Sequence, residues 1–183
     1  MIIIALGSNL NGVFGTPHQS ICRAINQLVA SGIKIKDASR LYRTRAYGCN
    51  PQPDFLNAIV TAHTALPAYA LLEILKRIEA QAGRCEAKDS QRWKARPLDL
   101  DIVCYKDVVY NWKMQKPVEG MRVILPHPRT HERAFVLQPL SDVAPFWHHP
   151  VFGLTASEFL KRPAVRQTGK ILSAGDFLRE FPS

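Results

Sequence analysis

An apolar run with acidic residues at two alternate positions constrains the fold of this chain more than any other feature. The run reads Leu98-Asp99-Leu100-Asp101-Ile102-Val103. Because successive side chains of a strand point to opposite faces, a strand here places Leu100 and Ile102 in a core. Both aspartates then share the other face, about 7 Å apart at Cα. We therefore expect a strand over residues 98–105 with two carboxylates on one face.

Two neighbouring carboxylates on one strand face repel each other unless a cation lies between them. Mg²⁺ is the cation we expect, since it prefers one or two carboxylates together with substrate phosphates. The polar face of a half-solvated edge strand is the usual explanation of an isolated Asp-x-Asp pattern. Here, however, the preceding segment contains Arg84, Arg92 and Arg96, with Trp93 beside them. Cations and carboxylates that converge on one place indicate a site for a metal ion and a polyphosphate.

Hydrophobic periodicity predicts further helices and strands. Strands are expected over residues 2–6, 33–43 and 55–64, helices over 18–30, 67–82 and 132–141, and a short helix opening at Thr155. Residues 44–54 and 84–97 are expected to be loops, and residues 108–110 to return beside the acidic strand. The order strand, helix, two strands, helix, strand predicts an α+β sandwich, with helices on one face of an antiparallel sheet.

The composition is that of a soluble globular protein from a reducing compartment. At 183 residues the chain is most simply one domain, large enough to build a core without disulfides. Its four cysteines form no Cys-x-x-Cys pair, which argues against a disulfide scaffold or a zinc knuckle. The first six residues have no basic region and are too short for a signal peptide or a membrane span. We expect a cytoplasmic protein.

A formal net charge of +9 suits a polyanionic partner. Nucleic acid, an anionic membrane and a phosphorylated small molecule all remain open on charge alone. The sequence has no basic run of the arm or tail type and no aromatic-interleaved recognition signature. Its basic residues are distributed, with a local concentration of arginines just before the acidic strand.

Common signatures of phosphate-handling and hydrolytic enzymes are missing. The sequence has no G-x-x-x-x-G-K-[ST] loop, no G-x-G-x-x-G loop and no G-x-S-x-G elbow. Gly7-Ser8-Asn9 is a weak signal, typical of a turn, and Pro128 between His127 and His131 argues against a zinc site. What remains is phosphoryl-type transfer, which needs positioning, metal ions and arginines. Residues 84–97 could then form a lid that closes over a nucleotide.

Five segments occur in an order that resembles a known family. They are Ala5-Leu6-Gly7-Ser8-Asn9-Leu10, Tyr42-Arg43-Thr44, Pro53-Asp54-Phe55-Leu56-Asn57-Ala58, Arg96-Pro97-Leu98-Asp99-Leu100-Asp101-Ile102 and Leu125-Pro126-His127-Pro128-Arg129. Together they resemble the 6-hydroxymethyl-7,8-dihydropterin pyrophosphokinases of the folate pathway. The match covers about residues 1–150. Residues 151–183 carry no recognisable motif, and we expect them to pack on a single domain of residues 1–183.

The resemblance implies a ferredoxin-like α+β fold, with ATP as co-substrate and two Mg²⁺ ions. The reaction would move the β,γ-diphosphate of ATP to the hydroxymethyl oxygen of the pterin and release AMP. Asp99 and Asp101 would hold both metal ions, with Arg84 and Arg96 as further catalytic residues. The nucleotide would contact Arg92, Trp93, Ile102, Arg122, His127 and Arg133.

The resemblance also implies a pterin pocket. Phe55 and Phe135 would stack on the flat ring, although ordinary core packing explains two phenylalanines equally well. Asn57 can donate and accept, so it can read the amide-like edge of the pterin. Thr44 and Tyr47 would line the same pocket.

Two other functions remain open. Glu86 and Ala87 stand where the family often has basic residues, which allows a catalytically idle module that binds pterin or nucleotide. A basic RNA-binding domain would also suit the charge, but an RNP1-type aromatic run is missing. We expect small-molecule partners, no nucleic acid and no membrane, together with possible association with neighbouring folate-pathway enzymes.

Overall fold

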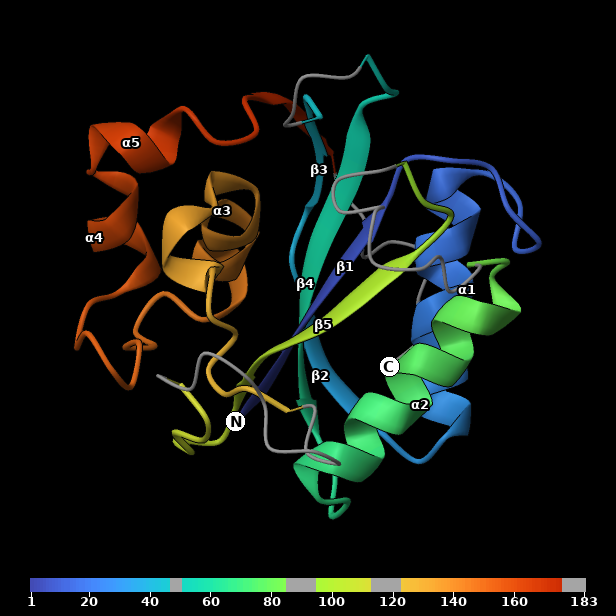
Figure 1. The fold of residues 1–183 in the computed structure, drawn as a ribbon, viewed down its shortest axis with the longest axis horizontal. Coiled ribbons are helices and arrows are strands. Elements are labelled where there is room, and N and C mark those ends of the chain that lie inside the picture. Colours follow the sequence, from blue (N-terminus) through green and yellow to red (C-terminus); the bar gives the residue numbers. More distant parts are fainter. Residues whose placement is uncertain (47–50, 85–94, 113–122, 176–183) are drawn as a thin grey trace.

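The computed structural model describes residues 1–46, 51–84, 95–112 and 123–175 (Figure 1). Its strands are β1 (Ile2–Ser8), β2 (Lys34–Ala38), β3 (Leu41–Thr44), β4 (Phe55–His63), β5 (Asp99–Tyr105) and β6 (Ile171–Gly175). Its helices are α1 (Pro17–Ala30), α2 (Ala68–Gln81), the 3₁₀ turn η2 (Thr130–Glu132), α3 (Ala134–Val143), α4 (Ala156–Leu160) and α5 (Pro163–Arg166). None of the helices in these segments combines the length and the apolar character needed to cross a bilayer.

The strands form one antiparallel sheet in the order β5-β1-β4-β3-β6, with β2 also paired to β4. Strand β1 lies between β4 and β5. Its register with both strands places residues of β5, the acidic strand, close to residues of β4. Gly7 of β1 lies opposite Asn57 of β4 on one side and opposite Asp99 of β5 on the other. Directly opposed residues share a face of the sheet, so these three positions are neighbours on one face.

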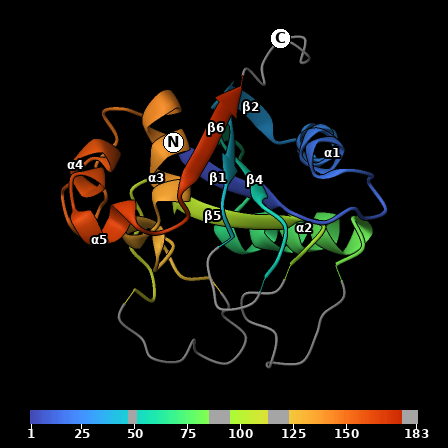
Figure 2. The same ribbon diagram turned by 90° about the horizontal axis from the view of Figure 1, so that it is seen from above.

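Helices cover both faces of the sheet, not one face as the sequence pattern predicted. Helices α1 and α2 lie on one side and α3, α4 and α5 on the other (Figures 1 and 2). Strand β1 shows the physical reason, because Ile2 and Ile4 belong to the core under α1 and α2, whereas Ile3 belongs to the core under α3. A strand that is apolar on consecutive positions must be covered on both sides.

The predicted helices and the strands over 2–6, 33–43, 55–64 and 98–105 are present with local differences, while most of the predicted loop over 84–97 lies outside the described residues. The predicted strand 33–43 is split into β2 and β3 at Ser39, whose hydroxyl accepts a hydrogen bond from Ile59 N of β4. Residues 108–110 do not return beside β5, since Tyr110 forms an isolated bridge with Leu125 instead. Helix α4 begins where expected, with a capping box between Thr155 and Glu158. Strand β6 was not predicted.

Candidate active site

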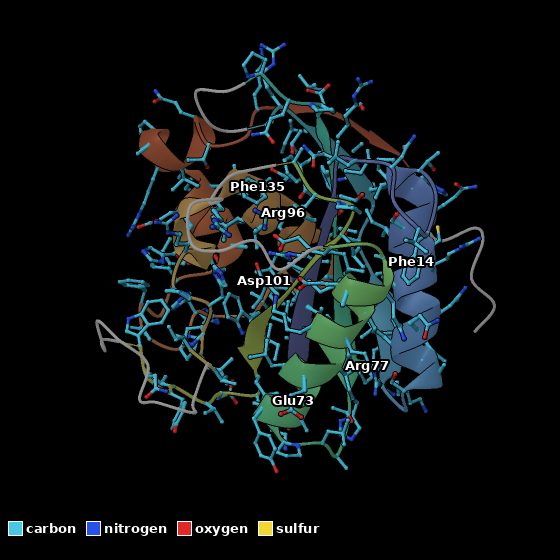
Figure 3. The ribbon with its side chains drawn as sticks, turned by 45° about the vertical axis from the view of Figure 1, so that its right-hand side comes forward. Phe14, Glu73, Arg77, Arg96, Asp101 and Phe135 are labelled. Carbon is cyan, nitrogen blue, oxygen red and sulfur yellow. The ribbon has the colours of Figure 1, made fainter. Side chains whose placement is uncertain are left out.

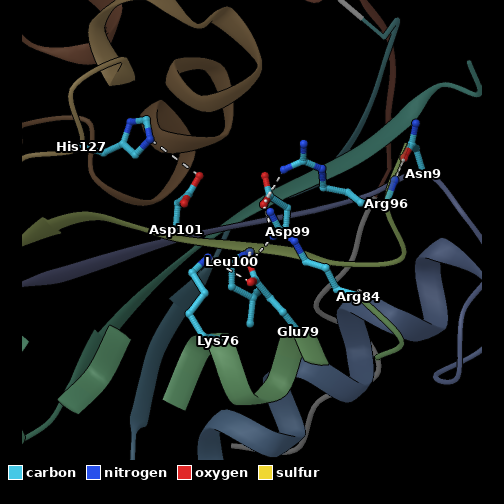
Figure 4. Close-up of polar contacts among 9 residues, drawn as sticks. All are labelled: Asn9, Lys76, Glu79, Arg84, Arg96, Asp99, Leu100, Asp101 and His127. Carbon is cyan, nitrogen blue, oxygen red and sulfur yellow. Dashed lines mark hydrogen bonds and ion pairs between the residues drawn. The ribbon is translucent and has the colours of Figure 1, made fainter. Parts of the chain in front are cut away.

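The acidic strand places its two carboxylates as the alternation predicted. Leu100 and Ile102 are buried in the core under α1 and α2, while Asp99 and Asp101 are partly exposed on the opposite face (Figure 4). Both aspartates line a pocket there, and Asp99 lines a second, adjoining one. The face therefore presents two carboxylates to a shared open space.

Asp99 is held by two arginines from the segments that flank residues 85–94. Its Oδ1 lies 2.6 Å from Arg84 and 2.9 Å from Arg96. Burial alone would raise the pKa of Asp99, but Arg96 and Arg84, with a further contribution from Lys76, lower it below its usual value. Asp99 is therefore ionised at neutral pH. A negative charge is what a carboxylate needs to bind arginines and metal ions.

Glu79 is a buried residue that the sequence analysis missed. Its Oε1 lies 2.7 Å from Arg84 and accepts a hydrogen bond of 2.7 Å from Leu100 N, on the β5 edge, and its Oε2 lies 2.9 Å from Lys76. Burial raises the pKa of Glu79, whereas Lys76 and Arg84 oppose that shift. The signal was present in the sequence, because Glu79 follows Leu75 by four residues on the apolar stripe of α2.

The Gly7-Ser8-Asn9 segment does more than form a turn. Asn9 Oδ1 accepts a hydrogen bond of 2.7 Å from Arg96 N, and Arg96 O accepts from Asn9 N at 3.1 Å. Ser8 Oγ donates to Pro97 O at 2.6 Å. The end of β1 thus fixes the backbone that carries Arg96, across more than eighty positions of sequence (Figure 4).

The second carboxylate faces residues that follow β5. His127 Nε2 lies 3.8 Å from Asp101 Oδ2, and His127 Nδ1 accepts a hydrogen bond from Arg129 N at 3.2 Å. Burial lowers the pKa of His127, although Asp101 partly offsets this effect. Burial also lowers the pKa of Arg133, which lines both pockets, and Asp101 and Asp99 oppose that shift. A neutral imidazole and a guanidinium therefore face the carboxylate pair.

The aromatic residues expected for a ring pocket do lie together. Phe55, Phe135, Thr44, Asn57 and Asp99 line one pocket, with Gly7, Arg45, Gln52, Arg96 and Arg133 around them. Figure 3 shows Phe135 and Arg96 at the same end of the sheet, with Asp101 nearby. The sequence analysis named neither Gly7 nor Gln52 for this pocket, since neither has a distinctive local pattern.

Asn57 is already hydrogen-bonded to a neighbouring side chain of the protein. Its Nδ2 donates to Thr44 Oγ1 at 2.7 Å, and both side chains are buried. A Cβ added to Gly7 would lie 3.2 Å from Asn57 Oδ1. The glycine therefore leaves room beside the amide, and the amide is oriented by Thr44 rather than left without a partner.

Four expected site residues, Tyr47, Arg92, Trp93 and Arg122, lie outside the described residues. Ile102 is only 6% exposed and packs in the core, and it is not among the residues that line the two pockets. Its contact with a nucleotide stays a prediction.

The carboxylate pair fits a hard cation. The described residues contain no group of three or more His, Cys, Asp or Glu side chains that would bind a metal by themselves. Mg²⁺ does not need such a group, because it keeps several waters and binds through one or two carboxylates plus substrate phosphates. Asp99 and Asp101, with arginines suited to phosphate beside them, have the required composition.

An antiparallel α+β sandwich with paired carboxylates, clustered arginines and an aromatic pocket defines a class of protein, the enzymes that transfer phosphoryl-type groups to a ring substrate. The sequence model of the 7,8-dihydro-6-hydroxymethylpterin-pyrophosphokinase (HPPK) family matches residues 3–145. The chain belongs to this family.

Named relatives agree with this assignment. A 2-amino-4-hydroxy-6-hydroxymethyldihydropteridine pyrophosphokinase of Synechocystis is 33% identical over 160 residues, which cover 87% of this chain and 74% of the relative. One from Porphyromonas gingivalis is 35% identical over 150 residues, 82% of this chain and 94% of the relative. The crystal structure of wild-type Plasmodium falciparum HPPK-DHPS with SDX-DHP has a TM-score of 0.63 at 16% identity, covering 93% of this chain. This chain spans 46% of that longer one, and the likeness shows the fold.

Proposed function

We propose that this chain transfers the diphosphate of ATP to the hydroxymethyl group of 6-hydroxymethyl-7,8-dihydropterin and releases AMP, a step of folate biosynthesis. Membership of the HPPK family supports this activity. The observation that carries it is Asp99, which lines the aromatic pocket and is also the anchor of two arginines. A ring substrate in that pocket would bring its hydroxymethyl group to the place where cations and carboxylates converge.

The pterin would lie between Phe55 and Phe135. Offset or edge-on aromatic contacts suit a flat heterocycle, and the Arg133 guanidinium already lies 5.6 Å from the centroid of the Phe135 ring. Asn57, oriented by Thr44, would read the amide-like edge through its carbonyl oxygen and its remaining N–H. Asn57 thus selects a ring with complementary donors and acceptors, and the phenylalanines supply affinity.

The phosphates would lie toward Arg84, Arg96 and Arg133. Guanidinium groups bind phosphate bidentately and stay charged, so they neutralise negative charge that develops during transfer. Asp99 and Asp101 would hold two Mg²⁺ ions, which would supply further positive charge to offset the negative charge on the phosphates. Glu79 keeps Arg84 aimed at Asp99 because it binds the same guanidinium nitrogen.

In the chemical step, the hydroxymethyl oxygen attacks the β-phosphorus of ATP. A new bond forms between this oxygen and the β-phosphorus, and the bond between the β-phosphorus and the oxygen bridging to the α-phosphate breaks. AMP leaves with that bond's electron pair. In this proposal, the aspartate nearer the hydroxymethyl group accepts its proton.

Nucleotide products test this proposal. The chain is incubated with Mg²⁺ and ATP, with and without 6-hydroxymethyl-7,8-dihydropterin, and AMP and ADP are separated by chromatography. Pterin-dependent AMP without ADP is expected. ADP would mean that a different phosphate bond is broken. If pterin binds but neither AMP nor ADP is formed, the chain is instead a catalytically idle module.

Association with a neighbouring pathway enzyme is a separate proposal about partners. It is supported by the Plasmodium falciparum HPPK-DHPS chain, in which the matched region is less than half of the whole. Sedimentation of this chain mixed with DHPS from the same source would test it. Independent sedimentation of the two proteins at micromolar concentration would contradict it.

A further inference from the structure

Residues 168–171 contact the aromatic pocket from outside the region that matches the family. The family match ends at residue 145. After it, the chain passes through α4 and α5 and returns to the sheet as β6, which pairs with β3. Strand β6 is the edge strand next to β3, and Figure 2 shows it in red beside α3. The return brings this short segment against both the helix and the strand that carry pocket residues.

Gly169 lies directly against the ring of Phe135. A Cβ built on Gly169 would be 2.7 Å from Phe135 Cδ1 and 3.5 Å from its Cβ and Cγ. Gly169 also has a φ of +64°, which residues with a side chain rarely adopt. The close contact with a pocket ring and the backbone conformation both require glycine here.

Thr168 holds the start of the helix that carries Phe135. Its Oγ1 accepts a hydrogen bond of 2.9 Å from Ala134 N, the first residue of α3. The same hydroxyl is 2.6 Å from Val165 O and 2.9 Å from Glu132 O, so it can donate to either carbonyl. Arg133, the N-cap of α3, supplies no side-chain cap, and Thr168 binds an N–H that the helix leaves unpaired.

Lys170 and Ile171 contact a second wall of the pocket, at the end of β3. Arg45 N donates to Lys170 O at 2.9 Å, and Ile171 lies opposite Thr44 in the β3–β6 register. Thr44 and Arg45 line the same pocket as Phe135. One segment of four residues therefore contacts two walls of the pocket at once.

We propose that residues 168–171 form a clamp that sets the position of Phe135 against the β3 wall, with Gly169 as a positioning residue for pterin binding. The inference rests on the proposed function for the identity of the ligand. A side chain at position 169 pushes the Phe135 ring out of its place, so the pocket loses complementarity to the pterin. Arg84 and Arg96, which with Arg133 would contact the phosphates, stay bound to Asp99.

Gly169→Ala tests the clamp, with Gly153→Ala as its matched control. Gly153 has nearly the same φ, +66°, but a Cβ there meets no atom within 4 Å. Both variants therefore carry the same backbone strain, and only one touches Phe135. Calorimetry should show a pterin Kd raised on the order of tenfold or more for Gly169→Ala. The Kd for ATP with Mg²⁺ should stay within about twofold of the parent, and Gly153→Ala should match the parent for both ligands.

A double variant separates ring displacement from a general loss of structure. In a Phe135→Leu background the ring is gone, so adding Gly169→Ala should cause little further loss of pterin affinity. If Gly169→Ala does not fold, Thr168→Val and Thr168→Ser replace it. The valine removes the hydroxyl that binds Ala134 N and should raise the pterin Kd, whereas the serine keeps the hydroxyl and should restore it.

The two hypotheses fail in distinguishable ways. Equal pterin Kd values for Gly169→Ala and Gly153→Ala, in a parent that makes AMP, would overturn the clamp and leave the proposed function intact. A parent that binds no pterin would overturn the proposed function and the clamp together. If Gly169→Ala raises the pterin Kd by the same factor in the parent and in the Phe135→Leu background, the clamp is also overturned.

Discussion

At the scale of single residues, Asp99 and Asp101 have the same side chain but different surroundings. Two arginines bind Asp99, whereas Asp101 faces His127. The lowered pKa of Asp99 means that its carboxylate is most stabilising above its ordinary pKa, and that this contribution is lost as the pH falls. The two arginines therefore link part of the stability of the fold to the ionised state of Asp99.

Replacing either carboxylate should stop turnover. Asp99→Asn and Asp101→Asn are each expected to lower kcat by roughly 10³-fold, because each would remove a proposed carboxylate ligand for Mg²⁺. Steady-state AMP release measures this effect. Asp101→Asn should change the free energy of unfolding by less than about 1 kcal/mol, since its side chain is partly exposed. Near-parental turnover in either variant would rule out the metal assignment.

Glu79 should affect activity through Arg84 rather than through the substrates. Glu79→Gln removes the buried anion between Lys76 and Arg84, and kcat should fall about tenfold as Arg84 loses one of two anchors. The free energy of unfolding should fall by roughly 1–3 kcal/mol. Urea unfolding and AMP release measure both effects.

Glu73→Gln is the control for Glu79. Glu73 is exposed on the same helix, and Figure 3 shows it away from Arg96 and Asp101. Glu73→Gln should leave kcat and the free energy of unfolding unchanged. Equal behaviour of the two variants would show that Glu79 has no positioning role.

At the scale of elements, a histidine in the loop between α3 and α4 is buried in a cluster of aromatic side chains. His149 is fully buried, with ring centroids 5.1 Å from Trp112, 5.0 Å from Phe152 and 5.8 Å from Phe159. Its Nδ1 accepts a hydrogen bond from Val151 N. Burial, with a smaller contribution from His131, lowers the pKa of His149 to about 4. The imidazole is therefore neutral in the folded protein.

This cluster should lose stability in acid. Because the folded-state pKa of His149 lies below its ordinary value, its contribution is complete above about pH 6.5 and is lost as the pH falls toward 4. The loss is on the order of 3 kcal/mol. His149→Phe should flatten the pH dependence of the unfolding free energy between pH 7 and 4.5. Its exposed neighbour provides the control His148→Phe, and identical pH profiles for both variants would contradict the assignment.

At the scale of the whole molecule, the candidate site lies where β1, β4 and β5 meet the start of α3, so a ligand bound there would contact both the sheet and α3. ATP with Mg²⁺ at 100 times its Kd should stabilise the fold by about 2.7 kcal/mol. For a chain of this size, that corresponds to a rise in Tm of about 5–10 °C. Differential scanning fluorimetry measures the rise. It should shrink when EDTA replaces Mg²⁺, and an equal rise with EDTA would show that nucleotide binding does not depend on the metal.

The sequence by itself determined the local elements and named several residues that the structure brings together. Alternation over residues 98–105 was enough to place Leu100 in the core and Asp99 on the other face, because the strand period is a local property of the chain. The resemblance to a known family implied pterin contacts for Phe55, Asn57 and Phe135, and these three residues line one pocket in the structure. The sequence analysis did not predict that helices cover both faces of the sheet. This arrangement follows from consecutive apolar residues in a strand, and periodicity alone does not say which face each of them occupies.

Only the tertiary structure decided which distant residues support that site. Asn9 binds the backbone of Arg96, Glu79 binds both Arg84 and Leu100, and Gly169 contacts Phe135. Hydrogen bonds and contacts between such positions arise from strand register and from the packing of helices on the sheet. Local sequence patterns report the face on which a side chain lies. They do not report the partner it meets there, because that partner comes from another part of the chain and its place depends on the complete fold.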